Sequence, residues 1–282
     1  MASRSFLILF LVALGSLGTL PARAEPRDLL SPERSEHLVF EARSRWNLVL
    51  VLDEGDLRHL RFGDVDGDTQ STVSLRDPRS VPMEYIRHAA SALAFTNRRR
   101  SALVIGLGGG TYPMLLRRSF PAMIIDVVEL DPLVRKVARR YFGFVEDGKL
   151  RVHIADGARF MRRTKRRWDI IFLDAYGVGG IPEPLANDAF FAGMARSLNP
   201  GGLAVANIAD EKTERERDII ARLARAFPAC ILQHTPRSNN IIAIAGAALP
   251  KDVAAALAAL DEEGRLPFPT AGMASLFRRC AE

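Results

Sequence analysis

The sequence predicts an α/β protein in which a small antiparallel β-domain precedes a doubly wound, mostly parallel sheet of seven strands. From Ser101 onward strands and helices alternate, which is typical of a parallel sheet with helices on both faces. Between Glu36 and Ser74, short strands are instead separated by turn residues such as Asp53-Glu54-Gly55. With 282 residues, the chain is long enough for one such α/β domain and a small addition.

The first part of the chain is expected to form the β-domain, within a leader-plus-domain segment of residues 25–80. Its strands are expected at His37–Ala42, Asn47–Leu52 and Leu57–Phe62. A helix over Pro82–Ala94 then leads into the larger domain, which is expected to span residues 81–282.

The larger domain begins with the most informative stretch of the chain. Ala102–Ile105 reads as a buried strand, and a glycine turn containing Gly106, Gly108 and Gly110 follows it. A helix over Pro113–Phe120 and a second strand ending at Glu129 complete the unit. Glycines let the backbone pass close under a ligand, and a carboxylate about 20 residues later can accept hydrogen bonds from a ribose. The unit therefore predicts a nucleotide or nucleoside site.

The remaining elements continue the alternation. The expected strands are Leu150–Ile154, Trp168–Asp174, Leu203–Ile208, Cys230–His234 and Asn240–Ala245, and the expected helices are Ala158–Arg163, Glu211–Phe227 and Pro250–Leu260. Asp131 is expected to cap a further helix that has Pro132 at its first position. Asn199-Pro200-Gly201-Gly202 is expected to turn before the strand at 203–208.

This order of motifs resembles the class I S-adenosylmethionine-dependent methyltransferase fold and, more closely, the spermidine synthase (polyamine aminopropyltransferase) family. The resemblance covers roughly residues 36–246 and rests on IGLGGGT, VVELD, ADGARF, WDIIFLDAY, the IPEPL stretch and LNPGGL. It implies transfer of an aminopropyl group from decarboxylated S-adenosylmethionine to an amine such as putrescine. It also implies no tightly bound cofactor and a homo-oligomer built through the β-domain.

The resemblance assigns the nucleoside half of the site. Gly106, Gly108 and Gly110 would form the floor under the methionine-derived part of the donor, and Glu129 would hold both ribose hydroxyls. Asp156, followed by Gly157, would accept from the adenine amino group, although Asp156 can equally cap the helix at 158–163.

The resemblance also assigns the acceptor half. Asp174 would be the base that takes the proton of the attacking amine. Tyr85, Tyr176 and Glu183 would line the acceptor wall, whereas Gln70, which matches a glutamine of the family's LDG-x-x-Q region, would bind the donor. A solvated loop position for Glu183 stays open at this point.

Three departures from the family pattern fall in the acceptor half. The second acid after Asp174 is absent, Thr111 replaces an acid of the glycine motif, and Tyr85-Ile86-Arg87 replaces Tyr-His-Glu. Two alternatives therefore stay open: a methyltransferase that uses S-adenosylmethionine itself, and a non-catalytic exported binding protein of the same fold.

Charge and histidine spacing exclude other classes. The formal charge of +6 comes mainly from arginine, and the runs at 98–100, 117–118 and 162–167 carry no interleaved stacking aromatics, so no nucleic acid partner is expected. The five histidines have no metal-ligand spacing, so no metal site is expected. They are His37, His59, His88, His153 and His234.

The N-terminus has the pattern of a secretory signal peptide over residues 1–24. Arg4 precedes the apolar stretch Phe6–Leu20, and Ala22-Arg23-Ala24 offers a cleavage site. The protein is therefore expected to be exported, with a membrane anchor over residues 6–20 as the alternative. Cys230 and Cys280 are the only cysteines, and the sequence leaves open whether they pair.

Overall fold

The computed structural model describes residues 36–65, 67–176, 180–209 and 213–280. The expected signal peptide or anchor lies outside these residues. Among them, no helix is both long enough and apolar enough to cross a membrane.

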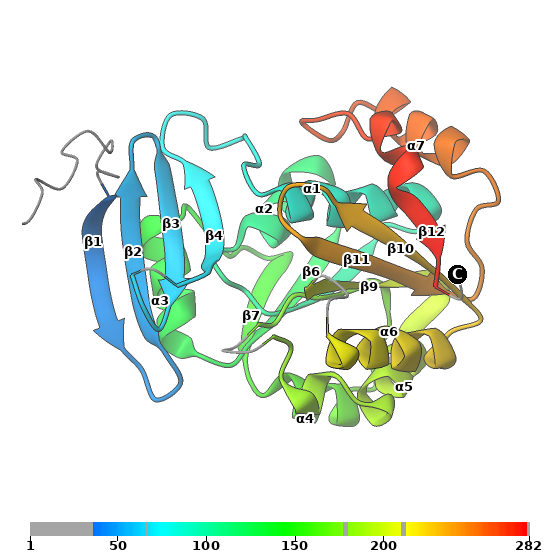
Figure 1. The fold of residues 1–282 in the computed structure, drawn as a ribbon, viewed down its shortest axis with the longest axis horizontal. Helices are drawn as coiled ribbons and strands as arrows, with labels where there is room; N and C mark the ends of the chain where they lie inside the picture. Colours follow the sequence, from blue (N-terminus) through cyan, green and yellow to red (C-terminus); the bar gives the residue numbers. More distant parts are fainter. Residues whose placement is uncertain (1–35, 66, 177–179, 210–212, 281–282) are drawn as a thin grey trace, which may run out of the picture. The chain divides into compact units, whose positions relative to one another are not determined.

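The N-terminal part of the described chain is a four-stranded antiparallel sheet in the order β1-β2-β3-β4 (Figure 1). Its strands are β1 (Glu36–Arg43), β2 (Leu48–Glu54), β3 (Leu57–Phe62) and β4 (Thr69–Ser74). The expected strands correspond to β1–β3. The sequence reasoning missed β4, because TQSTVS carries only one aliphatic residue and its alternation is weak.

The larger sheet has eight strands among the described residues, in the order β12-β10-β11-β9-β8-β5-β6-β7. The strands are β5 (Ser101–Ile105), β6 (Ile124–Glu129), β7 (Leu150–Ile154), β8 (Trp168–Leu173), β9 (Leu198–Ala209), β10 (Ala229–Thr235), β11 (Asn240–Gly246) and β12 (Phe277–Arg279). From β9 to β7 the strands are parallel, and β11 runs antiparallel to both of its neighbours. Seven strands follow the expected plan, and the short β12 extends the sheet beside β10.

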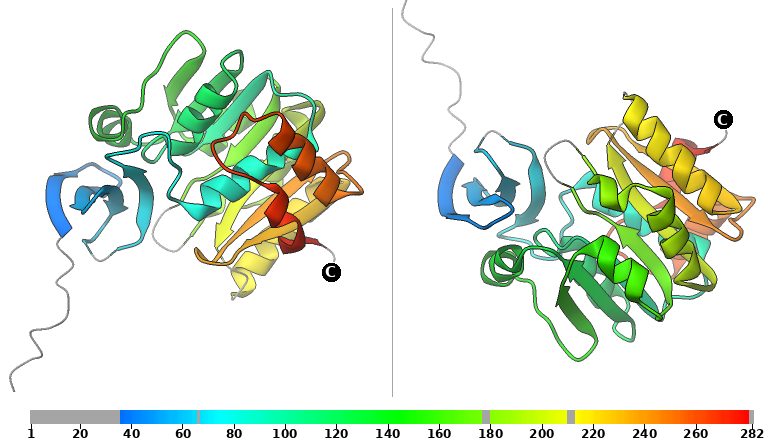
Figure 2. Two further views of the ribbon diagram at one scale, coloured as in Figure 1. Left: turned by 90° about the horizontal axis from the view of Figure 1, so that it is seen from above. Right: turned by 90° about the horizontal axis from the view of Figure 1, so that it is seen from below.

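Helices cover both faces of this sheet, as Figure 2 shows from opposite sides. The helices are α1 (Glu84–Ser91), α2 (Thr111–Ser119), α3 (Pro132–Tyr141), α4 (Gly157–Arg163), α5 (Asp188–Arg196), α6 (Glu214–Ala226) and α7 (Val253–Glu262), with short 3-10 turns η1 (Ala92–Phe95), η2 (Glu183–Leu185) and η3 (Ala271–Leu276). Residues of α1, α2, α3 and α7 share one apolar core, and those of α4, α5 and α6 share a second. This two-faced burial explains why the central strands read as continuous apolar runs.

Local signals explain where several helices begin. Asp131 caps α3 by accepting from the Leu133 N–H at 2.8 Å, with Pro132 at the first position as expected. Thr213 and Glu216 form a reciprocal capping box at the start of α6. The expected turn at 199–202 is instead part of β9, which starts at Leu198 and accommodates Gly201 at a φ of 75°.

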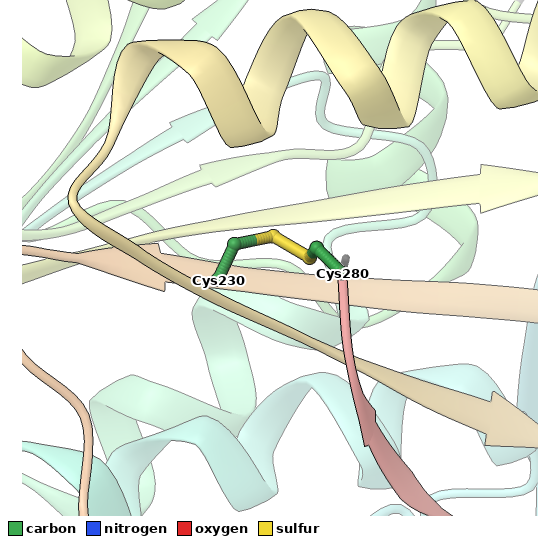
Figure 3. The surroundings of a disulfide bond; sticks show 2 residues. All are labelled: Cys230 and Cys280. Atoms are coloured by element: carbon green, nitrogen blue, oxygen red, sulfur yellow. A yellow bond between two sulfur atoms is a disulfide. The ribbon is translucent and has the colours of Figure 1, made fainter. Parts of the chain in front are cut away.

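The two cysteines form a disulfide, with their Cα atoms 5.4 Å apart (Figure 3). Cys230 lies in β10 and Cys280 directly follows β12, and the Cys280 N–H donates to the Cys230 carbonyl at 3.2 Å. The structure thus resolves the pairing that the sequence left open, and the bond fixes the chain end to the edge of the sheet.

Candidate active site

A cleft of about 940 Å³ lies at the carboxyl ends of the parallel strands. The residues that end or follow β5, β6, β7 and β8 contribute to its lining, as do the N-terminal sheet and the inner ends of β9 and β11. The carboxyl edge of an open α/β sheet is where such folds bind ligands. The cleft therefore occupies the position that the sequence predicts for the site.

The glycine turn packs tightly against Ser71 of β4 and against Asp174 after β8, and leaves no room for a Cβ atom. A Cβ at Gly106 would lie 2.1 Å from the Asp174 carbonyl oxygen, and φ there is +99°. At Gly108, where φ is +53°, a Cβ would lie 2.7 Å from Ser71 Oγ, and the same hydroxyl accepts from the Gly109 N–H at 2.8 Å. Glycine is thus required because the turn is clamped between β4 and the end of β8.

Glu129 ends β6 with its carboxylate held by the backbone. Its Oε2 accepts from the Leu107 N–H at 2.9 Å and its Oε1 accepts from the Asp131 N–H at 2.8 Å. Burial raises the pKa of the Glu129 carboxyl, and these backbone donors act in the opposite direction. A carboxylate can accept about four hydrogen bonds, so the group can hold the glycine turn and still accept from a ligand in the cleft.

Asp156 caps α4, because its Oδ1 accepts from the Arg159 N–H at 2.7 Å. It is also part of the cleft lining, together with Gly157. A Cβ at Gly157 would lie 2.9 Å from Ile105 Cγ2, which explains the small residue at this position. The two roles considered for Asp156 are therefore compatible.

Asp174 directly follows β8, and both of its carboxylate oxygens accept hydrogen bonds. Tyr85 Oη donates to Oδ2 at 3.1 Å, and Asn207 Nδ2 donates to Oδ1 at 2.9 Å. Burial raises the pKa of the Asp174 carboxyl to about 6, although the two hydrogen bonds favour the charged form. Burial and the neighbouring Asp174 charge raise the pKa of Tyr85, so the tyrosine remains a neutral donor.

Asn207, in β9, connects Asp174 by hydrogen bonds to Asn240 of β11 and to Tyr176. Its Oδ1 accepts from Asn240 Nδ2 at 2.9 Å, and its backbone carbonyl accepts from Tyr176 Oη at 3.2 Å. The sequence reasoning missed both asparagines. A polar residue inside the apolar strand LAVANIA was the available signal for Asn207.

Tyr112, in the first turn of α2, was also missed. Its side chain is 2% exposed, it belongs to the cleft lining, and its hydroxyl has no hydrogen-bond partner among the described residues. Burial and the Asp174 charge raise its pKa. A buried hydroxyl of this kind is available to a ligand that enters the cleft.

The structure places most of the other predicted site residues at the cleft, with two exceptions. Gln70 and Tyr176 contribute to its lining. Gly110 does not: it caps α2 at a φ of +81°, where a Cβ would lie 2.5 Å from Phe144 Cδ2. Glu183 does not either, since its side chain is 70% exposed and lies 3.9 Å from Arg222. After Tyr176, residues 177–179 lie outside the described chain, and Pro182, Pro184 and Leu185 contribute to the cleft lining.

The cleft lining has one sign of charge. Among the described lining residues there are seven carboxylates and no lysine, arginine or histidine, in a chain of net charge +6. The carboxylates belong to Asp64, Asp68, Glu129, Asp131, Asp156, Asp174 and Glu216. Such a lining favours a cationic ligand.

Known proteins are similar to this chain in sequence and in fold. The polyamine aminopropyltransferase of Vibrio vulnificus is 32% identical over 175 residues, which is 60% of this chain and 58% of that protein. The eEF1A lysine and N-terminal methyltransferase of Bos taurus is 31% identical over 137 residues, or 45% of this chain and 20% of that protein. The chain thus spans less than two thirds of the length of either relative.

A solved structure of spermidine synthase in complex with the transition-state analogue AdoDATO superimposes with a TM-score of 0.65. It is 20% identical, with 76% of this chain and 74% of that chain covered, so the likeness is one of fold. The model of the spermine/spermidine synthase domain matches residues 81–236, which include both Glu129 and Asp174. The chain therefore belongs to the spermine/spermidine synthase family.

Proposed function

We propose that the protein is an aminopropyltransferase, which moves the aminopropyl group of decarboxylated S-adenosylmethionine to an amine. The observation that carries this proposal is Asp174, a carboxylate with a pKa of about 6 inside an acidic cleft. Membership of the family and the relatives described above support the same reaction.

The nucleoside half of the cleft suits the donor. Glu129 offers acceptor lone pairs for the ribose hydroxyls, and Asp156 offers a second acceptor beyond β7 for the adenine amino group. The donor carries a sulfonium and an ammonium group, and both charges suit a lining of seven carboxylates. Neither contact requires a tightly bound cofactor.

The reaction is a displacement at carbon. The nitrogen lone pair of the amine attacks the methylene next to sulfur, the C–N bond forms, and the C–S bond breaks with its electron pair on sulfur. Methylthioadenosine leaves as a neutral product. The attacking nitrogen releases a proton, which Asp174 accepts on the lone pairs that Tyr85 and Asn207 leave free.

The acceptor half lacks acids of the family pattern, but other acidic residues line the cleft. The absent acids after Asp174 and at position 111 suggest a weaker amine site when the sequence is read alone. In the folded chain, Asp64 and Asp68 of the β3–β4 loop and Glu216 of α6 also line the cleft. These three acids support a cationic acceptor.

The test is to identify the nucleoside product. Purified protein is incubated with decarboxylated S-adenosylmethionine and a panel of mono-, di- and triamines, and the nucleoside is identified by mass spectrometry. Amine-dependent formation of methylthioadenosine is expected. Formation of no methylthioadenosine with any amine, from protein that binds the donor in calorimetry, would refute the transfer reaction.

Methyl transfer from S-adenosylmethionine is the second candidate. It is favoured by Thr111, because a neutral hydroxyl tolerates the donor carboxylate better than the acid it replaces, and by the similarity to the Bos taurus methyltransferase. The same assay separates the two reactions, since methyl transfer yields S-adenosylhomocysteine.

We also propose that the protein is exported. The support is the signal-peptide pattern of residues 1–24 together with the Cys230–Cys280 disulfide, because structural disulfides persist in oxidising compartments. N-terminal sequencing of the protein from fractionated cells would give Glu25 as the first residue of an exported form. An intact N-terminus in the membrane fraction would instead support an anchor over residues 6–20.

Homo-oligomer formation through the N-terminal sheet stays a proposal. The support is the family resemblance, together with the exposed side chain of Leu38 on the edge strand β1. Light scattering after size-exclusion chromatography measures the mass directly, and a monomeric mass at all concentrations would refute it.

A further inference from the structure

A second cavity, of about 610 Å³, begins where the glycine turn enters α2. Four segments form its walls: residues 73–81, one side of α2 from Thr111 to Ser119, residues 141–143 at the end of α3, and residues 264–267 after α7. It shares one lining residue with the acidic cleft, Thr111. Nothing in the proposed transfer reaction uses this cavity.

The charged residues of this cavity are opposite in sign to those of the cleft. The lining contains Arg79, Arg118 and Arg265 and, among the described residues, no aspartate or glutamate. Arg118 donates to the neutral Pro78 carbonyl, and no ion pair of the described chain involves Arg79 or Arg118. Arg265 is different, because its Nε lies 3.4 Å from Glu263 Oε2 and its guanidinium lies over the Phe120 ring. Arg79 and Arg118 therefore supply the uncompensated charge.

The rest of the lining is mainly apolar. The side chains that form this surface are Val73, Leu75, Met114, Leu115, Tyr141 and Phe142. Apolar walls with a few convergent polar groups, in a volume of several hundred cubic ångströms, are the usual composition of a small-molecule site. Arginine supplies paired donors that match a carboxylate or another oxyanion.

Thr111 adds a polar group between the two cavities. Its Oγ1 is buried and has no hydrogen-bond partner among the described residues. A buried hydroxyl without a partner is costly in a folded protein, so Thr111 Oγ1 would gain from a hydrogen bond to a ligand or an ordered water at this cavity wall.

We propose that the second cavity is a binding site for an organic anion with an apolar body, whose head group pairs with Arg79 and Arg118. The apolar body lies along Met114, Leu115 and Phe142. The site is separate from the transfer reaction, so it can be tested without turnover.

The test uses decanoate and decylamine, which share an alkyl chain and differ in the sign of the head group. Binding to the full folded protein is measured by calorimetry below the micelle concentration of each compound. Decanoate is expected to bind and decylamine to bind at least tenfold more weakly at this site, because its ammonium would face two arginines. To separate the cavities, the titrations are repeated with methylthioadenosine present to occupy the cleft.

The deciding variant is the double substitution Arg79→Gln/Arg118→Gln, which removes two charges from exposed side chains without changing the core. The matched control is Arg162→Gln/Arg163→Gln, two exposed arginines in the last turn of α4. Decanoate affinity should fall at least tenfold in the first variant and stay within twofold in the second.

Three results would overturn the proposal. One is equal decanoate affinity in the two double variants, and another is equal affinity for decanoate and decylamine in the unsubstituted protein. The third is a change of oligomeric mass in Arg79→Gln/Arg118→Gln without any decanoate binding to the original protein, which would assign the surface to a second copy of the chain.

Discussion

The two cavities on either side of Thr111 have opposite charge, although one glycine turn and one helix start contribute to both. The acids of the cleft come from the carboxyl ends of the parallel strands, the β3–β4 loop and α6, whereas the arginines of the second cavity come from residues 73–81, from α2 and from the segment after α7. The net charge of +6 predicts neither distribution. Local fields at the sites, rather than the total charge, therefore determine which ligands this protein can hold.

The largest expected effect comes from Asp174→Asn, which removes the base and leaves the shape of the cleft unchanged. Turnover should fall by about 100-fold to 10,000-fold, the usual contribution of a positioned proton acceptor. Methylthioadenosine affinity, measured by calorimetry, should change less than threefold. Asp188→Asn, an exposed acid of α5 paired with Arg225, is the matched control. Retained turnover in Asp174→Asn would remove Asp174 from this role.

Glu129→Gln should have the next largest effect, on nucleoside binding. The amide keeps one acceptor but places an N–H₂ where Leu107 or Asp131 already donates. Affinity for methylthioadenosine should fall roughly tenfold to 100-fold, as expected for lost hydrogen bonds to a charged group. The matched control is Glu262→Gln, which changes an exposed acid in α7 and should leave the affinity for methylthioadenosine unchanged. If the two variants bind alike, the ribose assignment fails.

The pH dependence tests whether the raised pKa belongs to the working base. Asp174 must be ionised to accept a proton, so the rate should rise with pH through about 6 and level off above it. Between about pH 7.5 and pH 5, kcat/KM should drop roughly tenfold. The profile is measured with the acceptor at constant protonated fraction or corrected for it. A profile that is flat over this window would contradict the assignment.

A smaller effect is expected for Tyr112→Phe. The hydroxyl has no partner among the described residues, so its removal should leave the melting temperature unchanged or slightly higher. If the amine ligand is its partner, kcat/KM should fall about three- to tenfold, which corresponds to one hydrogen bond of about 1 kcal/mol. Tyr141→Phe, at the second cavity, is the control and should leave turnover intact. Loss of stability together with activity would make Tyr112 a purely structural residue.

The smallest effect should connect the two cavities. An anion bound beside Arg79 and Arg118 adds negative potential near the cleft, which favours the cationic donor. Saturating decanoate should therefore raise donor affinity about twofold at low salt and leave neutral methylthioadenosine unaffected. Calorimetry at two salt concentrations measures this, and equal effects on both nucleosides would exclude an electrostatic origin.

The sequence predicted well what depends on local pattern. The glycine turn, the strand ending at Glu129 and the strand before Asp174 are contiguous signals, and the structure contains each of these elements. Asn207, Asn240 and the whole second cavity depend on strands and loops that meet only in the fold. Such long-range groupings have no periodicity to read. Glu183 shows the limit of a family-like stretch, because the sequence left open an acceptor-wall and a solvated position, and its side chain is 70% exposed and 3.9 Å from Arg222.

The disulfide makes a covalent ring of the last part of the chain. Fifty residues separate Cys230 from Cys280, and the ring contains β11, α7 and the segment 264–267 that walls the second cavity. Closing a ring of this size lowers the conformational entropy of the unfolded chain, which is worth about 4 kcal/mol by loop-closure reasoning. The strands β5 to β9, whose carboxyl ends line the cleft, lie outside the ring. Opening the ring would therefore leave the connections of β5 to β9 unchanged, and would remove a covalent constraint on the segment 264–267 at the basic cavity and on Ser238, Asn239 and Asn240 at the cleft.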